Sequence, residues 1–202
     1  MATATIPITN TPEANQLLVD DPLALLLGML LDQQVPMEWA FRGPATLAER
    51  LGGLDAPTIA AMDPEDLVAL FCAKPALHRY PASMARRTHE VCVHLTERYG
   101  GKADKLWKGA KTGPDLFARV RAVPGFGDEK AQIFCALLAK RFGVRPAGWE
   151  EACGVFADAT PRSVADSTDP ASLVEVRSFK KAMKAAKRDK QGEPLKGSAV
   201  TT

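Results

Sequence analysis

The chain has 202 residues, 46% of them hydrophobic and 25% charged, with a formal net charge of +2. This composition is typical of a globular protein and excludes disordered, collagen-like and coiled-coil classes. The length allows one domain or two small lobes. A helix that spans a bilayer needs about 20 apolar residues in succession, and the longest apolar run, Leu23–Leu31, is far shorter. With no secretory signal after Met1, we expect a cytoplasmic protein that does not bind membranes.

Helix signals recur along the chain and predict an all-α fold. Asp-Pro pairs precede three apolar runs, at Asp21-Pro22, Asp63-Pro64 and Asp169-Pro170. Asp accepts hydrogen bonds from the free N–H groups of a helix start, and Pro fits the first helical position. The apolar spacing predicts helices at 23–35, at 36–51 with a break at Gly43-Pro44, after Pro64, at 81–99, 114–122 and 128–142, and after Asp169.

The ends of the chain are predicted to be less ordered than its middle. We expect an N-terminal arm at 1–19, one helical domain at 20–191 and a disordered polar tail at 192–202. No stretch alternates with the period of a β-strand. The four cysteines stand far apart in apolar surroundings, which predicts buried, reduced thiols rather than disulfides.

Positive charge is concentrated in two places on a nearly neutral chain. Cations crowd the C-terminal stretch at 177–190, and lysines recur at every third position of an earlier segment. These lysines are Lys102, Lys105, Lys108 and Lys111. Such stripes indicate an electrostatic surface for a negatively charged partner. The alternative is a solvated helix surface that has no partner.

The most informative segment joins the helices predicted at 114–122 and 128–142. It reads Val123-Pro124-Gly125-Phe126-Gly127. Two glycines one residue apart permit backbone angles closed to other residues and leave main-chain N–H groups uncovered. These donors lie beside a helix N-terminus, which carries partial positive charge, so the turn suits a phosphate oxygen. Lys130, one turn into the helix, adds a positive charge. The alternative is a plain helix–helix turn.

This segment, followed by Lys130-Ala131, resembles the helix-hairpin-helix element of the HhH-GPD family of base-excision DNA glycosylases. Upstream, Leu30-Leu31-Asp32-Gln33-Gln34-Val35 is similar to the end of that family's early buried helix. The order of the intervening helices also fits, and the resemblance covers residues 20–143. It implies a two-lobed, all-α HhH-GPD-like fold with a DNA-binding cleft between the lobes.

The resemblance also implies roles for named residues. The hairpin would hold the backbone of double-stranded DNA, helped in the family by a K⁺ or Na⁺ ion at the hairpin carbonyls. Gln34, with Gln33, would fill the gap that is left when the damaged base is flipped out of the duplex. Lysines would add contacts to phosphate. The predicted DNA-binding residues are therefore Gln33, Gln34, Val123, Gly125, Gly127, Lys130, Lys105 and Lys108.

The sequence departs from the family pattern at several positions. Members that also cleave the strand carry a lysine where this chain has Glu129, so lyase activity is not expected. Members that remove adenine carry a glutamate where this chain has Gly28, so that activity is not expected either. Only Cys153 follows the hairpin helix, so we expect no iron–sulfur cluster and no required cofactor. The His and Cys side chains at 89–94 are spread around their helix, so no metal site is expected.

The family's essential carboxylate follows the second hairpin helix, and here no Asp stands at the usual distance. Asp166, in a Val-Ala-Asp context, is the first candidate, and Glu150, the nearest acid by count, is the second. Such a carboxylate stabilises the positively charged sugar of the transition state and can activate water. For each acid the alternative is a surface charge or a helix cap.

The sequence therefore predicts a monomeric, monofunctional DNA N-glycosylase that removes a damaged or mismatched base from duplex DNA. A second hypothesis keeps the scaffold without the catalysis, as a protein that binds DNA lesions or DNA structures. A third hypothesis is a helical protein-interaction module in which the glycine-rich turn is merely structural.

Overall fold

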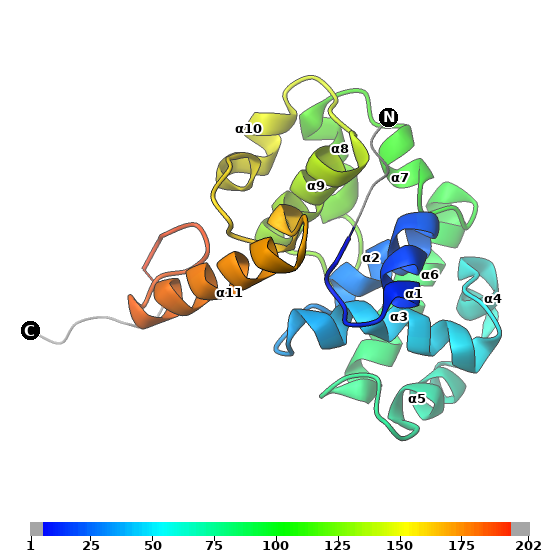
Figure 1. Ribbon diagram of the computed structural model, residues 1–202. Coiled ribbons are helices and arrows are strands. Elements are labelled where there is room, and N and C mark those ends of the chain that lie inside the picture. The colour runs from blue at the N-terminus through cyan, green and yellow to red at the C-terminus, as the bar shows by residue number, and fades with distance from the viewer. Residues whose placement is uncertain (1–5, 195–202) are drawn as a thin grey trace, which may run out of the picture.

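The computed structural model describes residues 6–194, and its regular structure is helical throughout this range (Figure 1). Within these residues there is no strand, only two isolated β-bridges. The all-α prediction is therefore confirmed. Of the predicted tail, residues 195–202 lie outside the described part of the chain.

Two groups of helices, each packed mainly within itself, make up the fold. The first contains α1 (Pro12–Asp20), α2 (Pro22–Leu31), α3 (Met37–Leu51), α4 (Ala56–Ala61), α5 (Pro64–Cys72) and α6 (Pro81–Tyr99). The second contains α7 (Lys105–Lys108), α8 (Gly113–Arg121), α9 (Asp128–Phe142), α10 (Trp149–Cys153), the 3₁₀ turns η1 (Gly154–Ala157) and η2 (Val164–Asp166), and α11 (Pro170–Ala185). Helices α8 to α10 lie above α1 to α5 in Figure 1, and these two groups are the two lobes.

Helix α2 lies at the centre of the fold, because every residue from Leu23 to Leu31 is buried. Helices α1 and α3 pack against it. Gly28 allows a close approach, since a Cβ there would lie 2.7 Å from the ring of Phe41 in α3. One apolar core continues from α2 into Phe126 and Phe134 of the second group. The near-continuous apolar sequence of α2 thus reflects a helix surrounded on all sides.

The predicted helix starts are confirmed at the Asp-Pro pairs. The carboxylates of Asp21, Asp63 and Asp169 each accept a hydrogen bond from a main-chain N–H of the following turn. The helices predicted at 81–99 and 128–142 have the same bounds as α6 and α9. Local signals therefore sufficed for these two helices, where an amphipathic run ends at a glycine, Gly100 after α6 and Gly143 after α9.

Other boundaries differ from the sequence prediction. Helix α3 runs without a break through Gly43-Pro44, because close packing of Gly43 on Leu31 of α2 outweighs the helix-breaking tendency of proline. Helix α2 ends at Leu31 rather than at Val35. Of the residues expected as an N-terminal arm, 1–5 lie outside the described part of the chain. Residues 6–19 pack onto the core, since α1 is helical and both Ile8 and Leu18 are buried.

Three of the four cysteine thiols are buried, and only Cys72 is exposed. Burial raises the pKa of Cys92 and of Cys153 to about 12, so both remain protonated. As for membranes, no single described helix is both long and apolar enough to cross one. Helices α1 and α2 pass that test only when taken together, and a bend of 114° separates them.

The contact between α8 and the loop before α10 yields a stability prediction. A Cβ on Gly113 would lie 2.1 Å from the carbonyl oxygen of Gly148, and main chain cannot move aside as a side chain can. We expect Gly113→Ala to lower the free energy of unfolding by about 3 kcal/mol, the upper range for overpacking. Gly127→Ala, with nothing within 4 Å of its added Cβ, should cost less than about 1 kcal/mol. Equal urea midpoints for the two variants would contradict this packing.

Candidate nucleic-acid interface

A tight hairpin joins α8 to α9. Its turn is closed by a hydrogen bond of 3.1 Å from the Phe126 N–H to the Val123 carbonyl. Phe126 is buried, and its ring meets that of Phe134 edge-on with centroids 5.9 Å apart. Gly125 has a φ of +84°, which favours glycine, and a Cβ there would lie 2.8 Å from Leu30 of α2. Phe126 thus anchors the hairpin in the core, while Gly125 lets it approach α2.

Five main-chain N–H groups of this hairpin have no acceptor among the described residues. They belong to Gly125, Gly127, Asp128, Glu129 and Lys130, and no side chain caps the start of α9. Gly125, Gly127 and Asp128 are exposed. Free donors at the start of a 15-residue helix carry the partial positive charge of the helix dipole. This arrangement fits an anionic oxygen.

The hairpin carbonyls are less available than its N–H groups. The Phe126 carbonyl accepts a hydrogen bond of 3.0 Å from Arg121, whose guanidinium also pairs with Asp128. The Val123 carbonyl accepts the N–H of Phe126. A K⁺ or Na⁺ ion on these oxygens would lie beside the Arg121 guanidinium, whose charge Asp128 offsets, and the cation site that the resemblance implies stays a prediction. Within residues 6–194, no group of three or more His, Cys, Asp or Glu side chains could hold a metal ion.

Lys130 points towards the end of α2. Its Nζ donates to the carbonyls of Met29 at 2.7 Å, Leu30 at 3.0 Å and Asp32 at 3.3 Å. The end of a helix leaves such carbonyls without a partner inside the helix. Burial lowers the pKa of Lys130 to about 8. The structure therefore places this lysine between the two groups of helices, where it joins them, rather than at the phosphate-facing surface expected from the sequence.

His78, in the loop before α6, completes the same cap. Its Nε2 lies 3.2 Å from the Leu31 carbonyl and 3.0 Å from the Gln33 carbonyl, while its Nδ1 accepts the N–H of Tyr80. Because Nδ1 is an acceptor, the ring is neutral and carries its proton on Nε2. Burial favours this state by lowering the pKa of His78. The imidazole is therefore a fixed donor to the end of α2.

The two neighbouring glutamines are held in different ways. The Gln33 amide is used inside the protein, since Nε2 donates to the Leu30 carbonyl at 2.6 Å and Oε1 accepts from Arg87 at 2.8 Å. Gln34 is exposed, has a φ of +56° and makes no side-chain hydrogen bond among the described residues. A positive φ outside glycine is strained, and such strain clusters at ligand-binding sites. Of the two, Gln34 is the residue that is free to reach a ligand.

A pocket of about 300 Å³ lies beside Gln34. Tyr80, which is 42% exposed, forms part of its wall, and Cζ of Arg79 lies 5.4 Å from the centroid of the tyrosine ring. Arg87 lines the same pocket, and its Cδ would lie 3.8 Å from a Cβ on Gly125. Arg87 thus connects the pocket to the hairpin, so the free N–H groups, the Gln34 amide and an exposed aromatic ring adjoin one another.

A carboxylate lies where α2 meets the hairpin. Asp32 directly follows α2 and is half-buried, and its side chain has no hydrogen-bond or ion-pair partner among the described residues. Burial lowers the pKa values of Lys130 and Lys180, and the negative charge of Asp32 acts on both in the opposite direction. Asp32 therefore belongs to a site that contains two largely buried lysines.

Asp166, the first acid singled out from the sequence, does not lie at the hairpin. Its carboxylate accepts from Lys140 at 2.6 Å and from the N–H groups of Arg162 and Ser163 at 3.0 Å. Lys140 lies ten residues beyond Lys130 in α9, which corresponds to about 15 Å along the helix. Asp166 is a nearly fully buried structural acid that caps η2.

Glu150, Lys105 and Lys108 lie on other helices of the second group, α10 and α7, rather than on the hairpin. Glu150 is exposed on α10, and the loop before α10 bonds to the start of α8, the end opposite the hairpin. Lys105 and Lys108 are exposed on α7, where Lys108 pairs with Asp104 at 2.9 Å. Among the predicted site residues, the structure brings together Gln33, Gln34, Val123, Gly125, Gly127 and Lys130.

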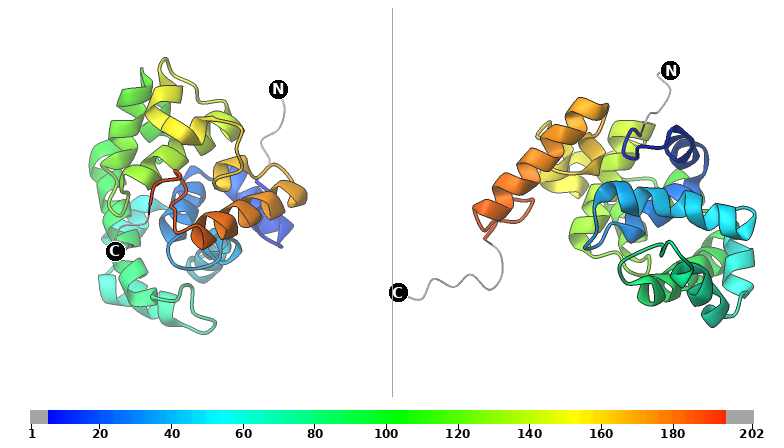
Figure 2. Two further views of the ribbon diagram at one scale, coloured as in Figure 1. Left: turned by 90° about the vertical axis from the view of Figure 1, so that its left-hand side faces the viewer. Right: turned by 60° about the horizontal axis from the view of Figure 1, so that its bottom comes forward.

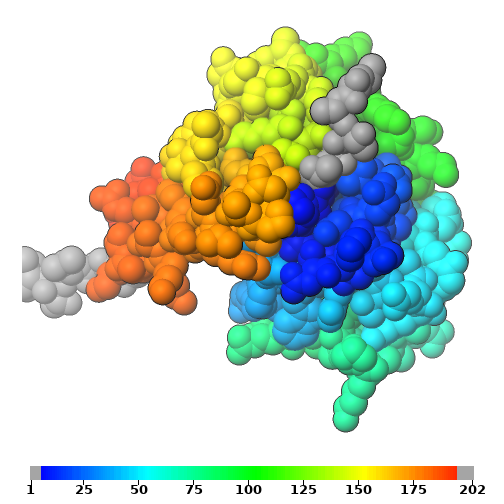
Figure 3. Space-filling view, in the orientation of Figure 1, coloured from blue at the N-terminus to red at the C-terminus, as the bar shows by residue number. Residues whose placement is uncertain are grey.

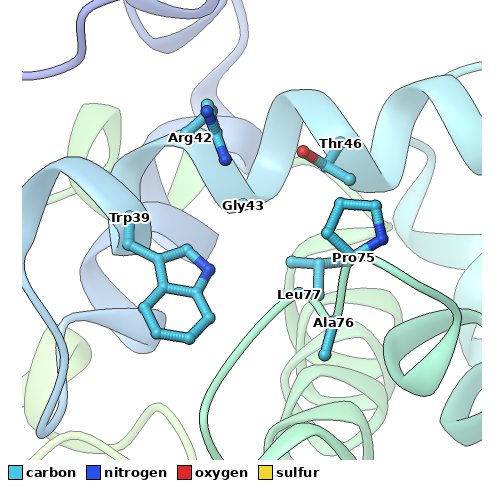
Figure 4. A pocket seen from close by; sticks show the side chains of 7 residues that line it. All are labelled: Trp39, Arg42, Gly43, Thr46, Pro75, Ala76 and Leu77. Carbon is cyan, nitrogen blue, oxygen red and sulfur yellow. The ribbon is translucent and has the colours of Figure 1, made fainter.

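A second pocket, of about 260 Å³, lies on α3. Trp39 and Arg42 of α3 line it, opposite Pro75 and Leu77 of the loop before α6 (Figure 4). Trp39 is 36% exposed, whereas Trp107 is buried against Phe134. The wall of this pocket contains no carboxylate, imidazole or thiol, so it offers binding surface without acid–base chemistry.

Sequence reasoning missed several residues of this site, namely His78, Tyr80, Arg87 and Lys180. The partners of His78 lie 47 and 45 residues earlier in the chain, so no local pattern indicates its role. Asp32 is different, because it stands inside the motif that carries the resemblance. Its position next to Gln33, at the end of a buried helix, was a usable signal.

Comparison with known proteins finds no matching family model and no matching curated protein. Among solved structures, the chain is similar to a trapped covalent intermediate of endonuclease III with DNA, an estranged-adenine complex. The TM-score is 0.46 and the identity 17%, over 84% of this chain and 73% of that chain. At this identity and score the likeness says nothing about which reaction the chain performs.

The buried ammonium of Lys130 yields a prediction for pH dependence. Because burial lowers the pKa of Lys130 from 10.5 to about 8, the unfolded chain binds more protons than the folded chain between these pH values. The free energy of unfolding should therefore rise with pH in this window, by up to about 1.4 kcal/mol per pH unit for this group. Lys130→Met lacks the group. Urea denaturation from pH 7 to 10 should show the wild type gaining stability relative to this variant, and parallel curves would contradict the buried ammonium.

Proposed function

We propose that the chain is a base-excision repair protein, a monofunctional DNA N-glycosylase that flips and removes a damaged or mismatched base from double-stranded DNA. The observation that carries this proposal is the set of five unpartnered N–H groups at the hairpin. Donors of this kind at a helix start bind phosphate without reading sequence, which suits a protein that must hold any duplex. The resemblance of the hairpin sequence to DNA glycosylases supports the same conclusion.

Base flipping is supported by the surroundings of Gln34. A flipped base leaves a gap in the duplex, and a side chain that enters it offsets part of the unstacking cost of a few kcal/mol. Gln34 is exposed, unpartnered and held in a strained conformation close to the hairpin. Tyr80, on the wall of the neighbouring pocket, offers a ring on which an exposed base can stack. We assign Gln34 to the gap and Tyr80 to stacking.

For the catalytic carboxylate we propose Asp32. Asp166 is committed to Lys140 and Glu150 is remote, whereas Asp32 stands two residues before Gln34, at the hairpin. A carboxylate there would stabilise the positive charge that develops on the sugar as the glycosidic bond breaks, and would accept a proton from the attacking water. We propose no lyase step, because the Lys130 ammonium is held by three carbonyls of the protein.

A second candidate function is lesion binding without catalysis. The protein would again bind duplex DNA as a monomer. The specific observation in its favour is that both acids expected from the sequence lie away from the hairpin. The two functions make the same contacts with the DNA backbone. They differ in whether a base is released.

Phosphate binding by a main-chain donor can be tested at Asp128. It is the first residue of α9, where proline is well tolerated, and Gly127 before it has φ −85° and ψ 177°, which a following proline also allows. Asp128→Pro removes one free N–H, whereas Asp128→Ala removes the same carboxylate and keeps the N–H. We expect Asp128→Pro to bind duplex DNA about tenfold more weakly than Asp128→Ala, the value of one hydrogen bond to a charged group. Fluorescence anisotropy measures this difference in affinity, and equal melting temperatures of the two variants show that both are folded. Equal affinities of the two variants would show that the main-chain N–H of residue 128 does not contact a phosphate.

Catalysis can be tested with duplexes that carry uracil, oxidised bases or alkylated bases, followed by alkali to cut abasic sites. We expect release of at least one base by the wild type, and loss of release by at least about 100-fold in Asp32→Asn with DNA affinity retained. Asp166→Asn serves as the control. It should lower stability by about 3 kcal/mol, because it breaks a buried ion pair, yet keep its activity below its melting temperature.

The outcomes of this assay separate the candidates. Activity lost in Asp166→Asn but kept in Asp32→Asn would reverse the assignment of the carboxylate. No release from any duplex by a wild type that binds DNA would support lesion binding and overturn the glycosylase.

A further inference from the structure

Helix α11 connects the second group of helices to the first. Leu173 and Val176 are buried on its inner side. Arg177 pairs with Glu38, and the Nζ of Lys180 lies 3.0 Å from the Sδ of Met37, both in α3. The far half of α11 then extends beyond the rest of the molecule (Figure 2). In the space-filling view its surface borders both the yellow segments of the second group and the blue segments of the first (Figure 3).

A groove of about 420 Å³ lies between the end of α11 and the start of α9. Its wall is rich in cations. It is formed by Glu129, Lys180, Met183, Lys184, Arg188, Asp189 and Lys190. The segment after α11 therefore turns back to bring its basic side chains beside the hairpin helix.

Both acids of the groove have partners inside the protein. Glu129 pairs with Lys190 at 2.9 Å. The Asp189 carboxylate accepts the N–H groups of Gln191 and Glu193, each at 2.9 Å, and so fixes the turn. Lys190 offsets the charge of Glu129, whereas Asp189 keeps its negative charge within this turn.

Cations remain after this pairing. Lys180 is directed into the protein, and burial lowers its pKa. Lys184 is exposed and has no partner among the described residues. Arg188 is exposed, and its guanidinium donates only to the Gly192 carbonyl among the described residues, so its charge is not neutralised by an acid. The groove thus presents an uncompensated positive charge to solvent.

The groove begins where the hairpin donors end. Glu129 lines it and is the second residue of α9, whose first three N–H groups have no acceptor in the described chain. A DNA strand whose phosphates contact the N–H groups of Gly127 and Asp128 would therefore reach Lys184 and Arg188 where it continues along the groove. Phosphate positions follow one another along a strand, so a second cationic surface next to the first favours a polymeric anion over a single ion.

We propose that the groove between α11 and α9 binds the phosphates of the same DNA duplex that the hairpin holds, and extends the DNA-binding surface through Lys184 and Arg188. This inference rests on the proposed function, because it takes duplex DNA as the partner of the hairpin. It assigns to the basic C-terminal stretch a role in affinity. The Lys190–Glu129 pair keeps the acid of α9 from opposing that binding.

The test uses full-length variants and a 20-base-pair duplex, with affinity measured at several salt concentrations. Lys184→Glu should weaken binding by at least about tenfold and reduce the slope of log K against log salt by about one, the loss of one phosphate contact. Arg98→Glu has the same change in charge on an exposed residue eleven positions beyond Arg87 in α6, about 16 Å along that helix. This control should leave the slope unchanged.

A second variant tests whether DNA affinity rises when negative charge is removed from the groove. Glu129→Gln removes the acid from the groove and frees Lys190, so affinity should rise several-fold and the slope should increase by about one. Glu97→Gln, on the exposed side of α6, is its matched control. Thermal melting shows whether either groove variant has lost structure, and light scattering gives the oligomeric state.

The outcomes distinguish this inference from the function on which it rests. A wild type that binds duplex DNA, with Lys184→Glu and Glu129→Gln no different from their controls, would overturn the groove and leave the proposed function intact. A wild type that does not bind duplex DNA at low salt would overturn both. A wild-type dimer that Lys184→Glu converts to a monomer would assign the groove to a second copy of the chain and overturn the inference.

Discussion

The end of helix α2 is the constraint on which the rest of this molecule depends. Burying a helix terminus leaves carbonyl groups that must find donors. Here the donors come from distant parts of the chain, with Lys130 supplied by the hairpin helix and His78 by the loop before α6. One set of hydrogen bonds therefore satisfies the central helix, joins the two groups of helices, and holds the Asp32–Gln34 loop against the hairpin.

This constraint explains how binding is divided between main chain and side chains. Because the Lys130 ammonium is used inside the protein, the proposed function requires the hairpin to bind phosphate through its N–H groups and to draw further positive charge from elsewhere. The C-terminal stretch carries that charge to the start of α9. In the same way, Arg87 and the Leu30 carbonyl hold Gln33, and only Gln34 remains free. The groups that are free to bind a ligand are therefore those that make no hydrogen bond inside the protein.

Local signals were enough to predict much of the fold and part of the site. Asp caps marked the starts of α2, α5 and α11, and glycine stops fixed the ends of α6 and α9. Two glycines in five residues marked the hairpin with its exposed donors. The remainder depends on contacts between residues far apart in sequence. Helix α3 passes through Pro44 because of packing on α2, and the direction of Lys130 is set by carbonyls about a hundred residues earlier. The residues next to Asp166 match the family motif, but the carboxylate of Asp166 forms an ion pair with Lys140.

The central claim is that the hairpin N–H groups receive a DNA backbone, and amide chemical shifts report on this directly. In a ¹⁵N-labelled protein, titration with an abasic duplex should shift the resonances of Gly125, Gly127 and Asp128 more than those of the amides of α4 and α5. Inorganic phosphate at the same concentration should have a smaller effect on these three. If DNA binds while these resonances stay unmoved and others shift, the hairpin is a plain turn and the account fails.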